Sequence, residues 1–164
     1  MKNRTACFSG HRQIPDDQYP VIWKNLLTVI TDLIQKGYRY FGSGGAIGFD
    51  IMAAQAILTL KPFYPHIRLI LVFPCITQSI KWSEHDRIIY EHLLARADKI
   101  VYTSHDYSQD CMLKRNRHLV DHSSICICYL TGITGGTAYT TDYAKHRGLK
   151  IINIARTDET ASLK

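Results

Sequence analysis

Short apolar runs alternate with helix-like segments along the chain, and this alternation constrains the fold more than any other feature. Six runs, starting near residues 5, 38, 67, 99, 125 and 149, have the length and composition of buried strands. Between them, apolar residues recur at spacings of three and four, as in helices with one buried face. Strands joined through helices pair in parallel with right-handed crossovers. The pattern therefore predicts an α/β, three-layer Rossmann-like sandwich with a mainly parallel six-stranded sheet.

Local signals mark where some of these helices begin and end. Gly37 follows a lysine and is expected to close the first helix in a left-handed conformation. Ser83 and Asp86 have the spacing of a capping box, which predicts a helix that opens at Ser83. In that helix, Ile88 and Leu93 belong to the expected buried stripe.

The size and composition of the chain fit one domain. Its 164 residues are 46% hydrophobic and 21% charged, which is typical of a globular protein rather than a disordered one. We expect a single domain over residues 1–164, with a core over about 5–154 and a polar C-terminal end that frays. No apolar stretch reaches the roughly 18 to 20 residues that cross a bilayer, so no membrane contact is expected.

Cysteine usage and the N-terminus favour a cytoplasmic location. The chain begins MKNRTACFSGHR, without the apolar segment of an export signal, and it contains 5 cysteines, an odd number. Reduced thiols in the cytoplasm are therefore expected. Cys126 and Cys128 lie two apart on one predicted strand, without a second pair of ligands nearby. They are interpreted as core residues, and no metal is predicted.

The charge balance favours anionic partners. Lys and Arg total 20 against 14 Asp and Glu, which gives a formal net charge of +6 and a pI near 9.1. Such an excess suits a nucleotide or a nucleic acid, and equally a basic surface without a ligand, because net charge bears first on solubility. Charge alone therefore does not select the partner.

Glycine-rich turns or short loops follow three of the predicted strands, at the edge of a parallel sheet where ligands bind. They are the segments 9–12, 42–50 and 135–137. Glycine lets backbone N–H groups approach a phosphate, and the helix that follows adds the positive end of its dipole. A tight turn without a ligand is the alternative for any single loop. Two glycine-rich turns on one edge, with basic residues nearby, predict a phosphate site.

These loops match neither of the common nucleotide fingerprints. The loop after the first strand lacks GxGxxG, and the loop after the second lacks the Lys-Ser/Thr ending of a P-loop. Neither dinucleotide binding nor ATP hydrolysis is indicated, and no cofactor is expected.

Trp82 lies in a long connection near the same edge. Its indole is either a surface for stacking on a base or a hydrophobic plug that holds the connection down.

A basic segment, residues 114–117, is expected at the start of the fourth helix. Positive side chains there oppose the helix dipole, and a bound anion would relieve this repulsion. Residues on a helix are about 100° apart, so Arg115 and Arg117 point in different directions. We expect one of them at the sheet edge and the other in solvent.

Four segments together resemble the SLOG superfamily, which groups the DprA/Smf DNA-processing proteins with the LOG phosphoribohydrolases. The segments are Ser9-Gly10-His11-Arg12, residues 43–50, Lys114-Arg115-Asn116-Arg117 and residues 135–140. The chain looks closest to the YpsA-like branch of small bacterial proteins, and the likeness extends over about residues 5–154. The resemblance implies a Rossmann-like domain that binds a nucleotide or a phosphorylated ribose at these loops.

Only part of the sequence pattern that LOG enzymes need for activity is present in this chain. Those enzymes contain a turn of the form GGxGTxxE, whose Thr holds phosphate and whose Glu assists cleavage of the base from ribose phosphate. Thr137 matches that Thr, but Thr140 stands in place of the Glu, and Asp142 lies about 200° further around the helix. Arg115 matches the arginine of a second LOG motif, in which Asn116 replaces a lysine. If the chain is an enzyme, the resemblance implies a nucleoside-monophosphate N-glycosidase-like hydrolase.

Two functions follow from these observations. The first is a cytosolic protein that binds a nucleotide or phosphoribosyl ligand, as a sensor or a weak hydrolase, with Asp50 as the candidate catalytic acid. The alternative is a single-stranded DNA-binding module of DprA-like type. A role in protein interaction with an empty pocket, or with a second copy of the chain, is a third. The candidate ligand-binding and phosphate-binding residues are Gly10, His11, Arg12, Ser43, Gly44, Gly45, Arg115, Asn116, Gly135, Gly136, Thr137 and Thr140, with Trp82 as the base-stacking candidate.

Overall fold

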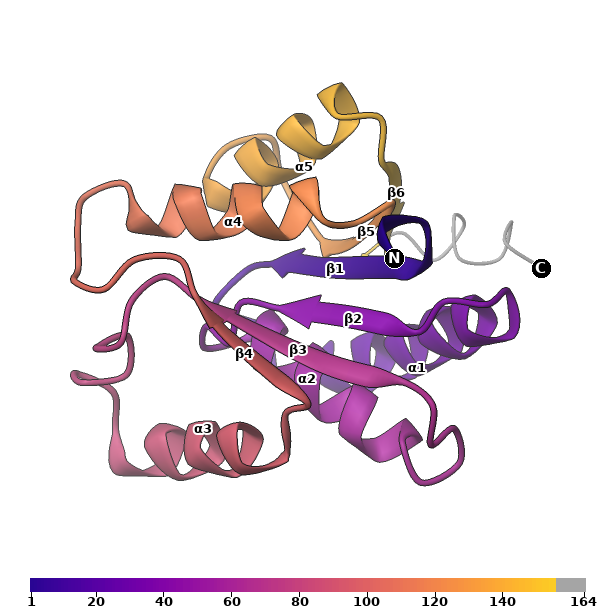
Figure 1. Ribbon diagram of the computed structural model, residues 1–164, viewed down its shortest axis with the longest axis horizontal. Coiled ribbons are helices and arrows are strands. Elements are labelled where there is room, and N and C mark those ends of the chain that lie inside the picture. The colour runs from indigo at the N-terminus through magenta and orange to yellow at the C-terminus, as the bar shows by residue number, and fades with distance from the viewer. Residues whose placement is uncertain (156–164) are drawn as a thin grey trace.

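Six parallel strands form one sheet at the centre of the structure, which is a computed structural model (Figure 1). It describes residues 1–155, so the polar end that the sequence predicts to fray lies outside the described residues. Along the sheet the strands are ordered β4-β3-β2-β1-β5-β6. They are β1 (Thr5–Gly10), β2 (Tyr40–Ser43), β3 (Arg68–Phe73), β4 (Lys99–Tyr102), β5 (Ile125–Tyr129) and β6 (Lys150–Asn153).

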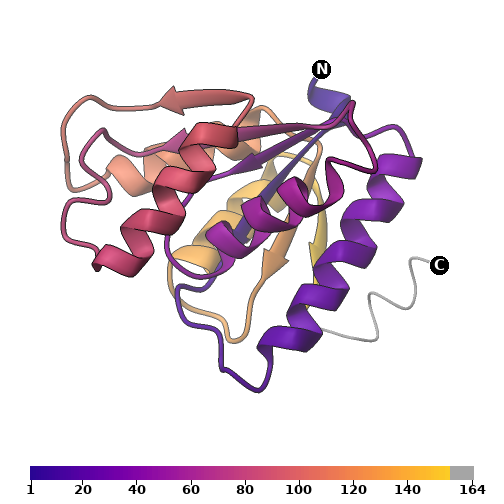
Figure 2. The same ribbon diagram turned by 90° about the horizontal axis from the view of Figure 1, so that it is seen from below.

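Helices connect successive strands and cover both faces of the sheet. They are α1 (Tyr19–Gln35), α2 (Phe49–Leu60), α3 (Glu84–Arg96), α4 (Cys111–Asp121) and α5 (Gly136–His146), and a short 3-10 turn, Lys2–Arg4, precedes β1. Figure 2 shows α1, α2 and α3 together on one face, whereas α4 and α5 lie on the other. The predicted α/β three-layer sandwich is confirmed, with a sheet that is parallel throughout.

The predicted helix boundaries follow from caps that the structure contains. Ser83 Oγ accepts a hydrogen bond from the N–H of Asp86 at 3.2 Å, which confirms the N-terminal cap of α3. Gly37 has a φ of +98°, as expected for the residue that closes α1.

The buried stripe predicted for α3 is wrong at one position. Ile88 is 60% exposed, and the buried face of α3 is formed by Tyr90 and Leu93. α3 lies beside α2 at the β4 border of the sheet (Figure 2), and its Tyr90 packs against Phe73 of β3, so only a narrow strip of the helix has a surface to pack against.

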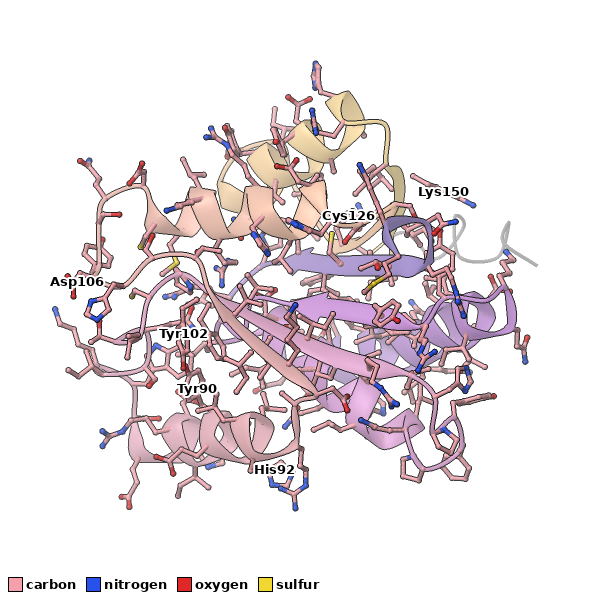
Figure 3. All side chains as sticks on the ribbon, in the orientation of Figure 1. Tyr90, His92, Tyr102, Asp106, Cys126 and Lys150 are labelled. Carbon is pink, nitrogen blue, oxygen red and sulfur yellow. The ribbon has the colours of Figure 1, made fainter. Side chains whose placement is uncertain are left out.

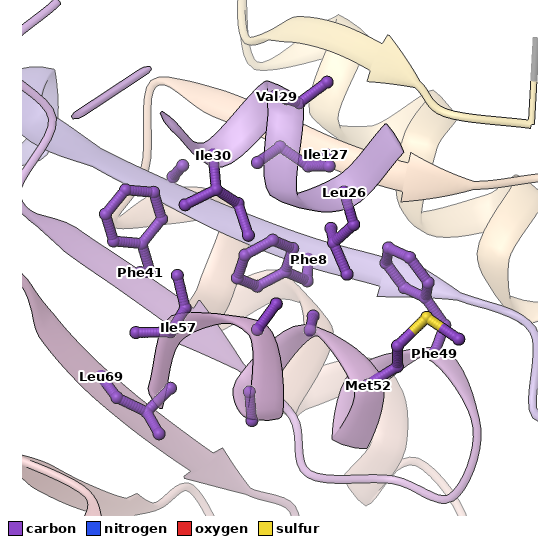
Figure 4. Packing of buried hydrophobic residues seen from close by; sticks show 14 of the residues in the cluster. Phe8, Leu26, Val29, Ile30, Phe41, Phe49, Met52, Ile57, Leu69 and Ile127 are labelled. Atoms are coloured by element: carbon purple, nitrogen blue, oxygen red, sulfur yellow. The ribbon is translucent and has the colours of Figure 1, made fainter. Parts of the chain in front are cut away.

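The larger core lies between the sheet and α1, α2 and α3 (Figure 4). Phe8 of β1 is at its centre, with ring centroids 6.4 Å from Phe41 of β2 and 6.3 Å from Phe49 of α2. Burial of a side chain of this size stabilises a fold by about 1.5–3 kcal/mol. The aromatic cluster therefore fixes the first turn of α2, and with it Asp50, beside the end of β1.

The smaller core lies between the sheet and the helices α4 and α5. It includes Cys126 and Cys128 of β5, which point to the same face and pack with Leu119 and Ala144. Figure 3 shows Cys126 beneath these helices. The interpretation of both cysteines as buried core residues is confirmed.

The direction in which the chain adds strands to the sheet reverses at β1: β2, β3 and β4 lie on one side of it, and β5 and β6 lie on the other. This reversal positions the functional site. β1 pairs with β2 on one side and with β5 on the other, so the connections diverge from the carboxyl ends of β1 and β5. Ligands of open α/β sheets bind at such a point. In Figure 1 the strands run from right to left, and this edge is on the left. Across residues 1–155, no helix has both the length and the apolar character that a bilayer crossing requires.

Candidate functional site

A cavity of about 420 Å³ lies where the end of β1 meets the N-terminal parts of α2, α4 and α5. Four segments that are distant in the sequence form its wall, and they include most of the predicted site residues. The lining residues are Phe8, Ser9, Gly10, His11, Arg12, Ala46, Asp50, Met112, Arg115, Asn116, Gly136 and Thr137.

Arg115 enters the cavity from α4 and is only 4% exposed. Its Nη1 donates to the carbonyl oxygen of Gly44 at 2.6 Å, and its Nε donates to Oδ1 of Asn116 at 2.7 Å. Among residues 1–155, no carboxylate lies within ion-pair distance of the guanidinium. Burial lowers the pKa of Arg115, yet a guanidinium remains protonated in proteins. The site therefore contains a buried positive charge that an anion would stabilise.

Asp50 faces the same space from the first turn of α2 and is 8% exposed. Its Oδ2 accepts a hydrogen bond from the N–H of Ala46 at 3.4 Å. Burial raises the pKa of the Asp50 carboxyl, and the positive charge of Arg115 opposes that rise. A carboxyl with a raised pKa in a cavity is suited to holding or giving up a proton beside a ligand.

Gly44 lies between these two charged groups. A Cβ at this position would lie 2.4 Å from Nη1 of Arg115 and 2.8 Å from Oδ2 of Asp50, both too close for a side chain. The absence of a side chain at Gly44 therefore allows the guanidinium and the carboxylate to approach the same turn.

Free backbone donors are found at the start of α5. In the described part of the chain, the N–H groups of Gly136, Thr137 and Ala138 have no acceptor, and Gly135 at the N-cap offers no side chain to them. The start of α5 thus presents unpaired donors and the positive end of its dipole, and Gly136 and Thr137 line the cavity.

The glycine turn after β2 has a different role. The sequence suggested free amides at both turns, but the N–H of Gly45 donates to Oγ of Ser43 at 3.2 Å, and that hydroxyl donates to the carbonyl of Asp50 at 2.8 Å. Ser43, Gly44 and Gly45 do not line the cavity. They form the support behind it, because the Ser43 hydroxyl, the N–H of Gly45 and the carbonyl of Gly44 are already used in hydrogen bonds.

His11 and Arg12 follow β1 at the edge of the cavity. Nε2 of His11 accepts a hydrogen bond from the N–H of Thr131 at 2.9 Å, so the imidazole joins the loops after β1 and β5. Arg12 is exposed, and its carbonyl oxygen lies 2.2 Å from where a Cβ of Gly48 would be. Gly48 has a φ of +96°, so this close approach requires glycine for both space and conformation.

A second cavity, of about 740 Å³, adjoins the first, and Arg12 and Met112 line both. Trp82 and Tyr107 belong to its wall. The Trp82 ring meets the Tyr90 ring edge-on, with centroids 5.2 Å apart. Trp82 thus packs against α3 and also lines a cavity, so the structure contains features of both interpretations of this residue.

Two further residues differ from the prediction: Thr140 was predicted at the site but does not line the cavity, and Gln78 lies near Arg115 but was not predicted. Thr140 is 3% exposed and its hydroxyl donates to the carbonyl of Gly136 at 2.9 Å, so it belongs to the helix rather than to the cavity wall. Gln78 was not predicted, although its Oε1 lies 3.5 Å from Nη1 of Arg115 and its Nε2 is buried without a partner among the described residues. No motif marks Gln78, because its place depends on how the connection after β3 folds.

Comparison with known protein families identifies the family of the chain. The family model of the YspA SLOG family matches residues 10–154. The chain belongs to this family. The match confirms the resemblance carried by the glycine turns and the basic segment.

Two curated relatives match most of the chain. It is 33% identical over 133 residues to the uncharacterized SPbeta prophage-derived protein YoqJ of Bacillus subtilis, which covers 73% of this chain and 78% of that protein. It is 31% identical over 121 residues to a UPF0398 protein of Halalkalibacterium halodurans, which covers 72% of this chain and 64% of that protein.

Solved structures share the fold of this SLOG chain. DNA processing protein A (DprA) of Streptococcus pneumoniae superposes with a TM-score of 0.66 at 14% identity, over 92% of this chain and 50% of that one. DprA of Helicobacter pylori, described for its single-stranded DNA binding mode, gives a TM-score of 0.65 at 21% identity, over 92% and 64%. The chain therefore spans only part of each solved protein.

Proposed function

We propose that this protein binds a nucleotide or another phosphorylated ribose in the cavity between α2, α4 and α5. The observation that carries the proposal is the meeting of unpaired backbone donors and a buried positive charge around one space. The unpaired N–H groups of Gly136 and Thr137 lie on one side, and the buried guanidinium of Arg115 lies on another. A phosphate supplies acceptors and negative charge to both.

The remainder of the ligand would extend from this phosphate along the two cavities. The carboxylate of Asp50 is placed to accept hydrogen bonds from ribose hydroxyls. The adjoining cavity, lined by Trp82 and Tyr107, offers apolar and aromatic walls to a base. The likeness to the SLOG superfamily supports this ligand class, as does the positive net charge.

Any hydrolysis at this site would depend on Asp50. Within the described chain it is the one carboxylate that lines the cavity, and Thr140 stands where LOG enzymes have a glutamate. A protonated Asp50 would donate to the departing base, and its ionised form would orient a water. General acid or base help contributes about 10²–10⁴ in rate. Asp50→Asn should therefore remove most turnover and leave binding measurable, and unchanged turnover would exclude Asp50 from the chemistry.

Isothermal titration calorimetry with ribose 5-phosphate, AMP and adenosine tests the proposal. We expect the two phosphorylated compounds to bind, and adenosine to bind at least about tenfold more weakly, because charge-assisted hydrogen bonds hold the phosphate. Arg115→Met should weaken AMP binding, whereas Arg117→Met, on the exposed side of the same helix, is the matched control. Failure of every phosphorylated ribose to bind would reject the proposal and favour a role in protein interaction.

Single-stranded DNA binding at the same sheet edge is a second candidate. The likeness in fold to DprA and the positive net charge support it. An oligonucleotide held by its phosphates should lose affinity steeply with added salt, because released counterions drive the association. A fluorescence titration with a labelled oligonucleotide at two salt concentrations tests this candidate, and no binding at low salt would exclude it.

A further inference from the structure

The edge of the sheet opposite to the cavity carries a row of arginines. Arg4 precedes β1, Arg39 precedes β2 and Arg68 begins β3. Backbone hydrogen bonds link the three segments. The N–H of Arg39 donates to the carbonyl of Arg4 at 2.9 Å, and the N–H of Arg68, which is in register with Tyr40, donates to the carbonyl of Arg39 at 2.8 Å. Neighbouring strands lie about 4.8 Å apart, so the three positively charged residues start from adjacent strand ends.

Lysines extend this row toward both sides of the sheet. Lys99 begins β4 and Lys150 begins β6, and both are exposed. Figure 3 shows Lys150 on the right, where the strands begin, and Asp106 on the left, where the cavity side lies. Positive charge therefore borders almost the whole amino edge, at the far end of the strands from the proposed nucleotide site.

The acidic groups near this edge are already engaged. Asp98 pairs with Lys61 and also accepts the N–H of Leu69 at 2.8 Å. Asp32 pairs with Lys36 at 2.9 Å.

Among residues 1–155 no carboxylate forms an ion pair with these arginines, although the charge of Arg68 is close enough to Asp98 to help lower the pKa of that carboxyl. Nε of Arg4 donates to the carbonyl of Gly37, and Nη1 of Arg68 donates to the carbonyl of Pro65. Within residues 1–155, the Arg39 side chain has neither a hydrogen bond nor an ion pair, and its Nε is a buried donor without a partner. The row therefore retains its positive charge.

Aromatic rings lie between these cations. Tyr40 is in register with Arg68, and the guanidinium carbon of Arg39 lies 5.7 Å from the centre of the Tyr40 ring. Phe63, in the turn before β3, is 77% exposed. In Figure 1 no helix stands between the viewer and β3 or β4, and Lys99 and Ile100 of β4 are exposed. These aromatic and basic residues come from separate strand ends, so no local sequence pattern brings them together.

We propose that this amino-edge surface, defined by Arg4, Arg39, Tyr40, Arg68 and Lys99, binds the phosphodiester backbone of single-stranded nucleic acid. Guanidinium groups form paired hydrogen bonds with phosphates, and cations on adjacent strand ends suit the successive charges of an extended strand. The half-buried Tyr40 ring, and the exposed Phe63 ring in the turn before β3, give a base surfaces for stacking. An acidic protein segment would use the cations but not this alternation with rings. The surface is separate from the cavity, so it does not depend on the proposed nucleotide binding.

Fluorescence anisotropy with labelled oligothymidylate and oligouridylate tests this surface. The test variant is Arg39→Gln/Arg68→Gln, and the matched control is Lys24→Gln/Arg87→Gln, which removes the same charge from exposed helix positions. We expect the test variant to bind about tenfold or more weakly, and its slope of log affinity against log salt to fall by about 1.4, at roughly 0.7 per phosphate contact. The control should keep the wild-type slope, and Arg39→Lys/Arg68→Lys should restore it.

Urea denaturation of each variant shows whether the fold is kept, and the lysine variant keeps the test informative if the glutamine variant is unstable. Equal losses in the test and control variants would overturn the proposal, because they would indicate a general charge effect. Loss with Arg12→Gln but not with the test variant would overturn it in favour of binding at the cavity edge. Competition by polyglutamate as strong as by unlabelled oligothymidylate would overturn it in favour of an acidic protein partner. No binding by the wild type at low salt would also reject it.

Discussion

Nη1 of Arg115 donates a hydrogen bond of 2.6 Å to the carbonyl oxygen of Gly44, 71 residues away in the sequence. The bond joins α4 to the turn after β2, and so holds the guanidinium at one place in the cavity. It requires a residue without a side chain at position 44, because the space of a Cβ is occupied by Arg115 itself and by Asp50. The glycine turn therefore acts on the ligand site through the position of Arg115.

Gly44→Ala should disturb both stability and binding. The new methyl group would displace the guanidinium or the turn, and overpacking of this kind costs about 1–3 kcal/mol in the free energy of unfolding. A displaced guanidinium should also weaken AMP binding by about tenfold or more. Urea denaturation and calorimetry measure the two effects.

Gly136→Ala is the control for this substitution. A Cβ at Gly136 would meet no atom within 4 Å, and its φ is not positive. At the start of a helix, alanine should leave the free energy of unfolding unchanged or raise it by up to about 1 kcal/mol. Equal destabilisation by Gly44→Ala and Gly136→Ala would contradict the role assigned to Gly44.

The pH dependence of stability should reveal the buried carboxyl of Asp50. Burial raises its pKa in the native state above the ordinary value of 3.8, so the native state keeps a proton that the unfolded chain has lost. The wild type should therefore lose stability as pH rises from the unfolded pKa through the native one. Asp50→Asn has no such proton. Urea denaturation over a pH series should show the wild-type free energy of unfolding falling relative to the variant, and parallel curves would count against the prediction.

The sequence predicts the fold well because the fold depends on patterns that are local. Short apolar runs, helix periodicity and the cap at Ser83 are each read within a few residues, and parallel strands then bring their carboxyl ends to one edge. Residues as distant as Gly10, Asp50, Arg115 and Thr137 could therefore be expected together, and the cavity includes all of them.

The remaining features depend on contacts between distant segments, which no local pattern encodes. The hydrogen bond from the N–H of Gly45 to Oγ of Ser43 depends on the backbone conformation of the whole turn. The approach of Gln78 to Arg115 depends on the path of the connection after β3. The exposure of Ile88 follows from the position of α3 at the border of the sheet.

Arg117 should be unimportant for ligand binding although it is two residues from Arg115. The sequence predicts that they point apart, and the structure confirms it: Arg115 is buried and Arg117 is exposed, with its guanidinium carbon 5.7 Å from the Tyr139 ring centre. Arg117→Ala should leave the affinity for AMP unchanged in a calorimetric titration, whereas Arg115→Ala should reduce it strongly. A similar loss in both variants would mean that charge near the cavity, rather than the buried guanidinium, governs binding.

His11 should act as a positioning residue that joins two loops of the site. Its Nε2 accepts the N–H of Thr131, and a hydrogen bond of this kind contributes about 0.5–1.5 kcal/mol. His11→Ala should speed hydrogen exchange at the Thr131 amide and lower the affinity for AMP, because the loops after β1 and β5 would separate more readily. His146→Ala is the control, since that exposed ring bonds only to the carbonyl of Asp142 within its own helix and to the Asp142 carboxylate. If exchange at Thr131 stays unchanged in His11→Ala, the two loops are held by other contacts, and the loss of affinity would have to come from direct contact between the imidazole and the ligand.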